Sequence, residues 1–188
     1  CFLLYNRCNQ NPWCEKDSGA DASRAVRYVR ANAEKYRIHP DQIAYVGFSN
    51  GAITGENCIH YYSGAQRMTD WYPDYTPDAL DEVYGAPDAF LCIYGPRHAG
   101  TPFDYEKVAY PPTFYAVGRE DFALQNLYQL LPLQIEHGVE VEIHTFAGVP
   151  HGQAGNRLVV GKNLYPNFEL WLPLADAFMQ NVFGKSKK

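Results

Sequence analysis

The residues of this chain whose types are best suited to chemistry are a serine, an aspartate and a histidine that follow one another along the sequence. Ser49 is the centre of residues 47–51 (GFSNG), which match the pattern Gly-x-Ser-x-Gly, and His151 lies in residues 148–152 (GVPHG). A serine hydroxyl is a poor nucleophile until a base removes its proton, and that base needs a third group to orient it. We therefore predict Ser49 as nucleophile, His151 as base and Asp121 as the orienting acid of an acyl-transfer site.

The segment around Ser49 predicts a sharp turn between a strand and a helix. Residues 42–48 are rich in β-branched and aromatic side chains, and a helical pattern follows Ser49. A serine at the apex of such a turn is a nucleophile elbow. We expect Gly47 and Gly51 to be required sterically, because the turn strains the serine backbone and crowds the neighbouring positions. The same turn offers the backbone N–H of Asn50 as an oxyanion donor.

Strand and helix patterns alternate along the chain, which favours an α/β fold with a mainly parallel sheet and helices on both faces. We expect a single domain over residues 1–188, without internal repeats. The spacing of apolar residues is that of an amphipathic helix over residues 21–36, with Arg24, Arg27, Arg30 and Lys35 facing outward. The expected strands are residues 1–5, 42–48, 88–94, 112–118 and 139–146, and the other expected helices are residues 50–62, 123–137 and 167–183.

Asp121 and His151 each follow an expected strand, and functional groups of open α/β sheets collect beyond the carboxyl ends of strands. Glu120 is a competing acid, and Asp121 has a second interpretation as a cap for the helix expected from residue 123. The other histidines lie before a strand, in helices, in an irregular loop or within a strand; they are His39, His60, His98, His137 and His144. Only His151 follows a strand end in the order serine, acid, histidine.

The composition argues against several classes of function. Hydrophobic residues make up 46% and charged residues 20% of the 188 residues, as in ordinary globular proteins. A net charge of -5 argues against nucleic acid or an anionic membrane surface as a partner. No apolar run reaches the roughly 18 residues of a membrane-spanning helix. The chain also lacks a phosphate-binding loop, a zinc-ligand pattern and a dinucleotide fingerprint.

The five cysteines do not form a metal-ligand pattern; they are Cys1, Cys8, Cys14, Cys58 and Cys92. We expect Cys58 and Cys92 to be small buried core residues. Cys8 and Cys14 lie close enough in sequence to pair, although free thiols are the preferred interpretation. The odd number favours a cytoplasmic over a secreted location.

Three blocks of sequence resemble a known family. They are residues 21–52 (DASRAVRYVRANAEKYRIHPDQIAYVGFSNGA), 111–121 (PPTFYAVGRED) and 138–152 (GVEVEIHTFAGVPHG), with a closing Trp-Leu at 171–172. They are similar to the acetyl-xylan-esterase and BD-FAE-type carboxylesterases of the α/β-hydrolase superfamily. The resemblance covers most of the chain and implies an α/β-hydrolase fold with the three catalytic roles given above. It also implies ping-pong hydrolysis of small esters, often acetyl groups on plant polysaccharide, without a metal or an organic cofactor.

The chain departs from this family in two places. Asn50 and Ala52 stand where the family more often has Ala or Gly and then Gly, which alters the pocket floor beside the serine. The family's His-Gly-Gly-Gly-type loop, which supplies a second oxyanion donor, would precede residue 1. We therefore expect a C-terminal part of a longer protein, without the first strands of the sheet and with residues 1–5 at an open edge. Losing one donor costs roughly 10²–10³ in rate, so the isolated 188-residue chain should show weak or no activity.

The sequence therefore supports three hypotheses about function. The first is a serine carboxylesterase for short acyl esters, acetyl esters of carbohydrate in particular. The second is a serine peptidase or thioesterase of the same superfamily, and the third is a catalytically inactive binding protein with this fold. The aromatic residues of the loop at 64–87 have two interpretations, a sugar-stacking platform or, preferred, packing of the loop; they are Trp71, Tyr72, Tyr75 and Tyr84.

Overall fold

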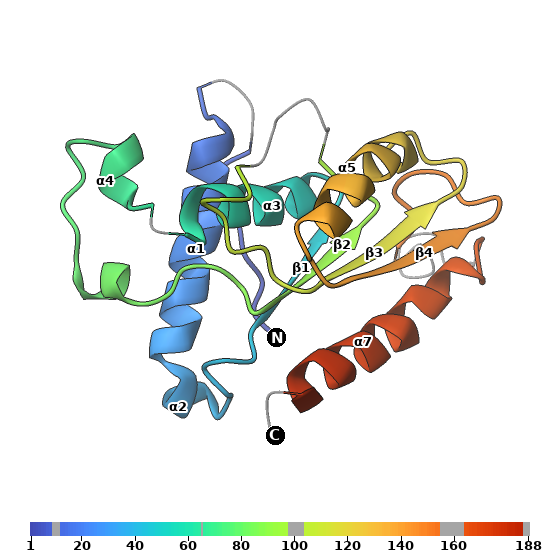
Figure 1. Ribbon diagram of the computed structural model, residues 1–188. Coiled ribbons are helices and arrows are strands. Elements are labelled where there is room, and N and C mark those ends of the chain that lie inside the picture. Colours follow the sequence, from blue (N-terminus) through green and yellow to red (C-terminus); the bar gives the residue numbers. More distant parts are fainter. Residues whose placement is uncertain (9–11, 65, 98–103, 155–163, 186–188) are drawn as a thin grey trace. The chain divides into compact units, whose positions relative to one another are not determined.

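The computed structural model describes residues 1–8, 12–64, 66–97, 104–154 and 164–185 (Figure 1). The chain divides into two compact units. The first comprises Cys1–Tyr45, Thr54–Asp88 and Phe103–Pro111, and the second comprises Val46–Ile53, Ala89–Pro102 and Pro112–Lys188. A single domain over residues 1–188 remains a prediction. No helix within the described ranges has both the length and the apolar character needed to cross a membrane.

Four strands form one sheet in the order β1-β2-β3-β4. They are β1 (Ala44–Phe48), β2 (Ala89–Ile93), β3 (Thr113–Gly118) and β4 (Val141–Phe146). Strand β3 is parallel to both β2 and β4, with Thr113 opposite Phe90 on one side and Val141 on the other. The strands expected from residues 42–48, 88–94, 112–118 and 139–146 are thus confirmed, each shorter by one or two residues at an end. Because parallel strands carry their carboxyl ends to one edge, the loops after them meet there.

Helices cover both faces of the sheet in the second unit. These are α5 (Leu124–Glu136) and α7 (Trp171–Lys185), the latter preceded by a short 3₁₀ helix, η2 (Phe168–Leu170). The Phe114 ring lies 5.7 Å from that of Phe178 on α7, whereas Gln134 on α5 donates a 2.7 Å hydrogen bond to the Tyr115 hydroxyl. Since successive strand residues point to opposite faces, α5 and α7 lie on opposite sides of β3, as Figure 1 shows. The helices expected at 123–137 and 167–183 are confirmed.

The first unit is built around α1 (Glu15–Ala31), followed by the single turn α2 (Ala33–Tyr36). Helix α1 begins six residues before the expected start at residue 21, because the Asp17 carboxylate accepts a 2.7 Å hydrogen bond from the Cys14 N–H and caps an earlier turn. Helix α3 (Asn50–Tyr62) has the expected bounds. The loop at 64–87 contains two short helical turns, α4 (Met68–Trp71) and the 3₁₀ helix η1 (Ala79–Glu82).

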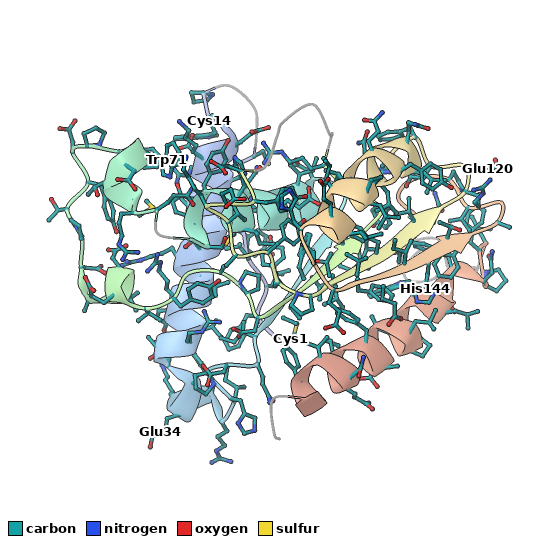
Figure 2. All side chains as sticks on the ribbon, in the orientation of Figure 1. Cys1, Cys14, Glu34, Trp71, Glu120 and His144 are labelled. Atoms are coloured by element: carbon teal, nitrogen blue, oxygen red, sulfur yellow. The ribbon has the colours of Figure 1, made fainter. Side chains whose placement is uncertain are left out.

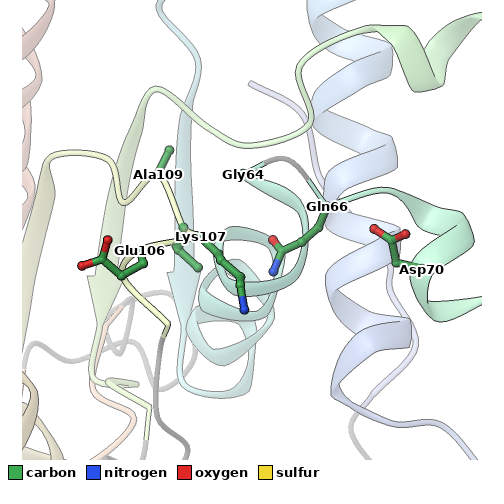
Figure 3. A pocket seen from close by; sticks show the side chains of 7 residues that line it. Gly64, Gln66, Asp70, Glu106, Lys107 and Ala109 are labelled. Atoms are coloured by element: carbon green, nitrogen blue, oxygen red, sulfur yellow. The ribbon is translucent and has the colours of Figure 1, made fainter.

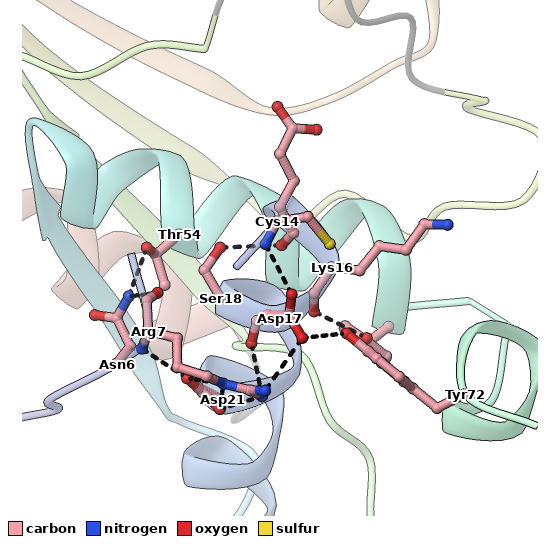
Figure 4. Close-up of polar contacts among 11 residues, drawn as sticks. Asn6, Arg7, Cys14, Lys16, Asp17, Ser18, Asp21, Thr54 and Tyr72 are labelled. Carbon is pink, nitrogen blue, oxygen red and sulfur yellow. Dashed lines mark hydrogen bonds and ion pairs between the residues drawn. The ribbon is translucent and has the colours of Figure 1, made fainter. Parts of the chain in front are cut away.

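Residues 1–5 form neither the buried strand nor the open edge strand that the sequence predicts, so both expectations are wrong. The segment forms no strand, and the side chains of Leu3 and Tyr5 are 80% and 89% exposed. No described strand pairs with it, so its apolar side chains have no sheet to pack on. The segment that follows is instead anchored by Arg7, whose guanidinium pairs with Asp17 at 3.1 Å and with Asp21 at 2.7 Å (Figure 4).

The expected outward direction of the α1 arginines is wrong for Arg27. Its side chain is buried, and Nη1 donates to the main-chain carbonyls of Asp81, at 2.6 Å, and of Val83. Arg24 forms an ion pair with Asp78, and Arg30 pairs with Asp88 at 2.7 Å. Arginines at helical spacing have the same sequence pattern as a solvated helix surface. In the structure, these arginines instead bind the loop at 64–87 to α1.

Cys8 and Cys14 do not form a disulfide; all five cysteines are free thiols. Cys1, Cys8 and Cys14 are exposed, whereas Cys58 and Cys92 are buried as predicted. Burial raises the pKa of the Cys58 thiol to about 12.

Candidate active site

Three loops beyond the strand ends of the second unit bring the predicted site residues together. Ser49 follows β1 directly, Asp121 follows β3 by three residues, and His151 follows β4 by five residues. The Ser49 Oγ lies 2.8 Å from His151 Nε2. On the other side of the imidazole, His151 Nδ1 lies 3.0 Å from both carboxylate oxygens of Asp121. All three predicted residues are therefore joined in one hydrogen-bonded chain.

The turn holds Ser49 in a strained backbone conformation, with φ of 51°. The left-handed region costs a residue with a Cβ roughly 1–2 kcal/mol. Hydrogen bonds maintain this conformation: the Ser49 N–H donates to the Ile93 carbonyl at 3.0 Å, and the Ser49 carbonyl accepts from Ala52 N–H at 2.9 Å. The hydroxyl is thus presented at the apex between β1 and α3, as the sequence pattern predicts.

Of the two glycines of the turn, only Gly47 is required sterically. A Cβ at Gly47 would lie 2.4 Å from the Ala52 Cα, whereas a Cβ at Gly51 would meet no atom of the described residues within 4 Å. The expectation for Gly51 is therefore wrong, because α3 carries that position away from the crowded side of the turn. A glycine outside the motif is needed instead, since a Cβ at Gly95 would lie 2.3 Å from the Ser49 carbonyl oxygen. The sequence feature that could have indicated the importance of Gly95 is its position directly after the strand expected at residues 88–94.

Asp121 makes the contacts expected from both interpretations of its sequence position, the helix cap and the neighbour of the histidine. Its buried carboxylate accepts a 2.8 Å hydrogen bond from the Ala123 N–H, just before α5, as well as facing the imidazole. Glu120 is exposed and points outward at the end of the sheet, away from the molecule (Figure 2). The neighbouring carboxylates are thus distinguished by direction, one buried against His151 and one in solvent.

The remaining histidines have other places in the structure. His144 lies within β4, where its Nε2 is 2.8 Å from a carboxylate oxygen of Glu142. His39 precedes β1, His60 lies on α3 and His137 ends α5. His98 falls outside the described residues.

Two aromatic residues that the sequence reasoning missed flank the imidazole of His151. The Tyr94 ring lies edge-on, with centroids 5.2 Å apart, and the Phe122 ring is tilted, with centroids 4.5 Å apart and planes at 31°. Tyr94 has a φ of 42°, and burial, followed by the Asp121 charge, raises the pKa of its hydroxyl. Their positions in the sequence could have indicated that they lie near the site, because Tyr94 ends an expected strand and Phe122 directly follows Asp121.

Asn50 is the first residue of α3, so its backbone N–H points out of the helix N-terminus beside Ser49. The N-terminal N–H groups of a helix and its dipole favour negative charge. The first turn of α3 carries no acidic side chain that would oppose this. The role of the Asn50 N–H as an oxyanion donor remains a prediction, and this position at the start of a helix is compatible with it.

A separate cavity of about 570 Å³ lies in the first unit (Figure 3). Its lining contains none of the three site residues; it is formed by Gly64, Gln66, Asp70, Glu106, Lys107, Val108 and Ala109. The Lys107 ammonium is paired with Asp104 at 2.9 Å. Within the described ranges, no group of three or more His, Cys, Asp or Glu is arranged to hold a metal ion.

The aromatic residues of the loop at 64–87 make contacts within the first unit. Trp71 donates to the Tyr61 carbonyl at 3.3 Å, and the Lys16 ammonium lies 4.5 Å from its ring centroid. The Tyr72 hydroxyl donates to Asp17 at 2.9 Å (Figure 4), and Arg30 lies over the Tyr84 ring. These contacts favour packing of the loop over a sugar-stacking platform.

The fold and this site define a class of protein: an α/β sheet with a serine at a strained strand–helix turn and an aspartate and a histidine after later strands. Comparison with solved structures identifies the fold. The chain superimposes on an acetyl ester-xyloside bifunctional hydrolase from Caldicellulosiruptor lactoaceticus with a TM-score of 0.69 and 22% identity, over 94% of this chain and 70% of that one. The chain therefore has the α/β-hydrolase fold.

Two further structures show the same fold. A thermophilic esterase from the planctomycete Thermogutta terrifontis matches with a TM-score of 0.66 and 19% identity over 89% of this chain and 66% of that one. An α/β hydrolase from a Medee basin deep-sea metagenome library matches with a TM-score of 0.63 and 22% identity, over 87% of this chain and 64% of that one.

Sequence comparison gives a narrower result. No protein-family model matches the chain. The chain is 35% identical over 75 residues to endo-1,4-beta-xylanase B of Butyrivibrio fibrisolvens, which is 39% of this chain. It spans only 10% of the length of that relative.

Proposed function

We propose that this protein is a serine ester hydrolase in which Ser49 is the nucleophile, His151 the general base and Asp121 the residue that orients His151. The observation that carries the proposal is the 2.8 Å contact between Ser49 Oγ and His151 Nε2, backed by Asp121 at 3.0 Å from Nδ1. Facing the carboxylate, Nδ1 bears the proton and Nε2 is left to accept one from the serine. The proposed roles require this tautomer.

In acylation, the Ser49 oxygen forms a bond to the ester carbonyl carbon as its proton passes to His151 Nε2. The carbonyl oxygen becomes negatively charged and accepts a hydrogen bond from the Asn50 N–H. The bond between carbon and alcohol oxygen then breaks, and His151 returns the proton to the departing alcohol. Asp121 stabilises the imidazolium during this transfer without taking up the proton itself.

In deacylation, water takes the place of the alcohol. His151 removes a proton from the water, whose oxygen attacks the acyl carbon of the ester to Ser49. The bond to Ser49 breaks, and His151 returns the proton to the serine oxygen. The acid is released, and no other group is consumed.

We propose that the substrates are small-molecule or saccharide esters with short acyl groups, acetyl groups in particular. Two similarities support this: one structural neighbour is named as an acetyl ester-xyloside hydrolase, and the relative that matches in sequence is a xylanase. A serine peptidase or thioesterase would use the same three residues. A catalytically inactive binding protein would have no need for a strained serine at φ 51° or for a buried carboxylate behind the histidine.

A fluorophosphonate probe tests the nucleophile in the intact protein. An activated serine attacks phosphorus and becomes covalently labelled, as a structural neighbour is described as phosphorylated by paraoxon. We expect a label on Ser49, measured by peptide mass spectrometry, and its loss in Ser49→Ala. Ser63→Ala, which changes a buried serine outside the three residues, is the control. Because the isolated 188-residue chain is expected to show weak or no activity, the deciding sample is the full-length parent protein: no label on it, with native circular dichroism, would refute the proposal.

A series of p-nitrophenyl esters tests the acyl group. We expect the largest kcat/KM for acetate and a decline as the acyl chain lengthens. Activity that increases with chain length, or that is confined to peptide or thioester substrates, would favour the corresponding alternative.

A further inference from the structure

Phe122 presents an apolar ring to solvent directly beside the proposed base. Its side chain is 75% exposed, and its ring lies 4.5 Å from the imidazole of His151 with the two planes at 31°. A phenyl ring that buries so little of its surface adds little to the hydrophobic stabilisation of the fold. Folding alone therefore does not explain why a large apolar side chain lies at this position.

The backbone that carries Phe122 is held by other groups. The Asp121 N–H donates to the Gly118 carbonyl at 3.2 Å, and the Asp121 carbonyl accepts from the Leu124 N–H at 3.1 Å. The Asp121 carboxylate also accepts from the Ala123 N–H at 2.8 Å. These bonds fix the turn on both sides of Phe122, so the ring is positioned before any substrate arrives.

We propose that Phe122 is a specificity residue, which forms a platform for the alcohol part of the ester and favours a six-membered ring over a short alkyl group. The assignment rests on the proposed function, because it requires His151 to act as the base. One face of the phenyl ring lies toward the imidazole. The exposed remainder is available to the C–H groups of a substrate ring.

The chemistry at His151 places the alcohol on this side of the site. To return a proton, His151 Nε2 must come within about 2.6–3.2 Å of the alcohol oxygen. The carbonyl oxygen must meanwhile face the Asn50 N–H at the start of α3. The carbons attached to the alcohol oxygen therefore lie beside the imidazole, where Phe122 stands, whereas the acyl chain extends elsewhere.

Phe122 also differs from Tyr128 of its own unit and from the aromatic residues of the loop at 64–87, which lie in the first unit. Tyr128, on α5, is 45% exposed, but its hydroxyl accepts a hydrogen bond from Arg119 at 2.7 Å and it contacts none of the three site residues. Trp71 and Tyr84, the earlier candidates for sugar stacking, are engaged by Lys16 and Arg30. A ring platform for a saccharide alcohol is therefore assigned to Phe122.

The test compares two esters with the same acyl group and different alcohols, cyclohexyl acetate and ethyl acetate. Both give the same acetyl-enzyme, so deacylation is identical and only acylation reports on the alcohol. For Phe122→Ala in the intact protein, we expect kcat/KM for cyclohexyl acetate to fall about five-fold relative to that for ethyl acetate, as the stacked apolar area is lost. Phe122→Trp should retain the preference, and Tyr128→Ala should leave both values unchanged.

The outcomes separate this proposal from the proposed function. An equal fall with both esters would mean that Phe122 only supports His151, and no change with either would mean that the ring has no role; either result overturns the assignment while the esterase stands. If wild-type protein hydrolyses neither ester and Ser49 takes no fluorophosphonate label, the proposed function fails, and the assignment fails with it. A thermal melt of each variant excludes misfolding as the cause of a loss.

Discussion

At the scale of single residues, the role proposed for Asp121 depends on the direction of one carboxylate. It is buried between the Ala123 N–H and the imidazole of His151, whereas the adjacent Glu120 is in solvent. In the proposed mechanism, its negative charge would favour the imidazolium that forms when Ser49 loses its proton. Two chemically similar neighbours thus have different surroundings.

Asp121→Asn should lower kcat by roughly 10⁴-fold, because an amide at this position favours the wrong histidine tautomer. The amide oxygen can still accept from the Ala123 N–H, so we expect only a small change in melting temperature. Steady-state kinetics with p-nitrophenyl acetate and a thermal melt measure the two effects. Glu120→Gln is the matched control, and a comparable loss in that variant would contradict the assignment of the acid.

Sequence reasoning placed together the residues whose position follows from chain order and strand ends; their catalytic roles remain a proposal. Ser49, Asp121 and His151 were found because each comes directly after an apolar run and their order matches a catalytic arrangement. Tyr94, Gly95 and Phe122 were missed, because their importance arises only from contacts between loops that the sequence does not pair. The buried position of Arg27 was missed for the same reason, since the carbonyls that receive it lie more than 50 positions away.

At the scale of elements, the junction of β1 and α3 depends on two close approaches, at Gly47 and at Gly95. Each places a backbone within 2.5 Å of where a Cβ would stand. The four expected strands that formed were predictable from apolar runs. Residues 1–5 have the same pattern and formed none, because a strand also requires a partner to pair with.

Gly47→Ala should be strongly destabilising, by several kcal/mol, because the new methyl would clash with the backbone of Ala52 and the turn would have to shift. Gly51→Ala should be neutral or slightly stabilising, because Ala is favoured over Gly within a helix. Urea unfolding measures the free energy of unfolding of both variants and of the wild-type protein. A severe loss for Gly51→Ala alone would reverse the assignment of which glycine the turn requires.

The contact between α1 and η1 should make stability depend on pH. The hydrogen bond from Arg24, and then that from the Leu80 N–H, lowers the pKa of Asp78 to about 2, against about 3.9 in an unfolded chain. A lowered carboxyl pKa gives a stabilisation that is fully present above about pH 4 and is lost as the pH falls through about 2. Asp78→Asn should therefore flatten this part of the pH dependence of the urea midpoint, and Asp74→Asn, which changes an exposed carboxylate, should not.

At the scale of the whole molecule, the chain combines two compact units with free thiols that differ in burial. The composition correctly indicated an ordinary globular chain, and the alternation of strand and helix patterns correctly indicated an α/β sheet. The division into units had no sequence signal, because each unit is assembled from segments that are separated along the chain.

Alkylation at pH 8 should modify Cys1, Cys8 and Cys14 in the native protein and spare Cys58 and Cys92. The Cys58 thiol, with its pKa raised to about 12 by burial, remains protonated and unreactive at that pH. Mass spectrometry before and after unfolding in urea counts the labelled sites. Modification of Cys58 in the native protein at the rate of Cys14 would contradict the burial on which this expectation rests.

The contact between Ser49 and His151 joins positions 102 residues apart in the chain. Closing so long a segment costs entropy before any contact compensates for it, and long-range parallel pairing is slow to form. The pair therefore comes into existence only when β1 through β4 have assembled, and no local structure can substitute for it. Under the proposed function, the recovery of covalent labelling at Ser49 during refolding should therefore follow the assembly of the sheet.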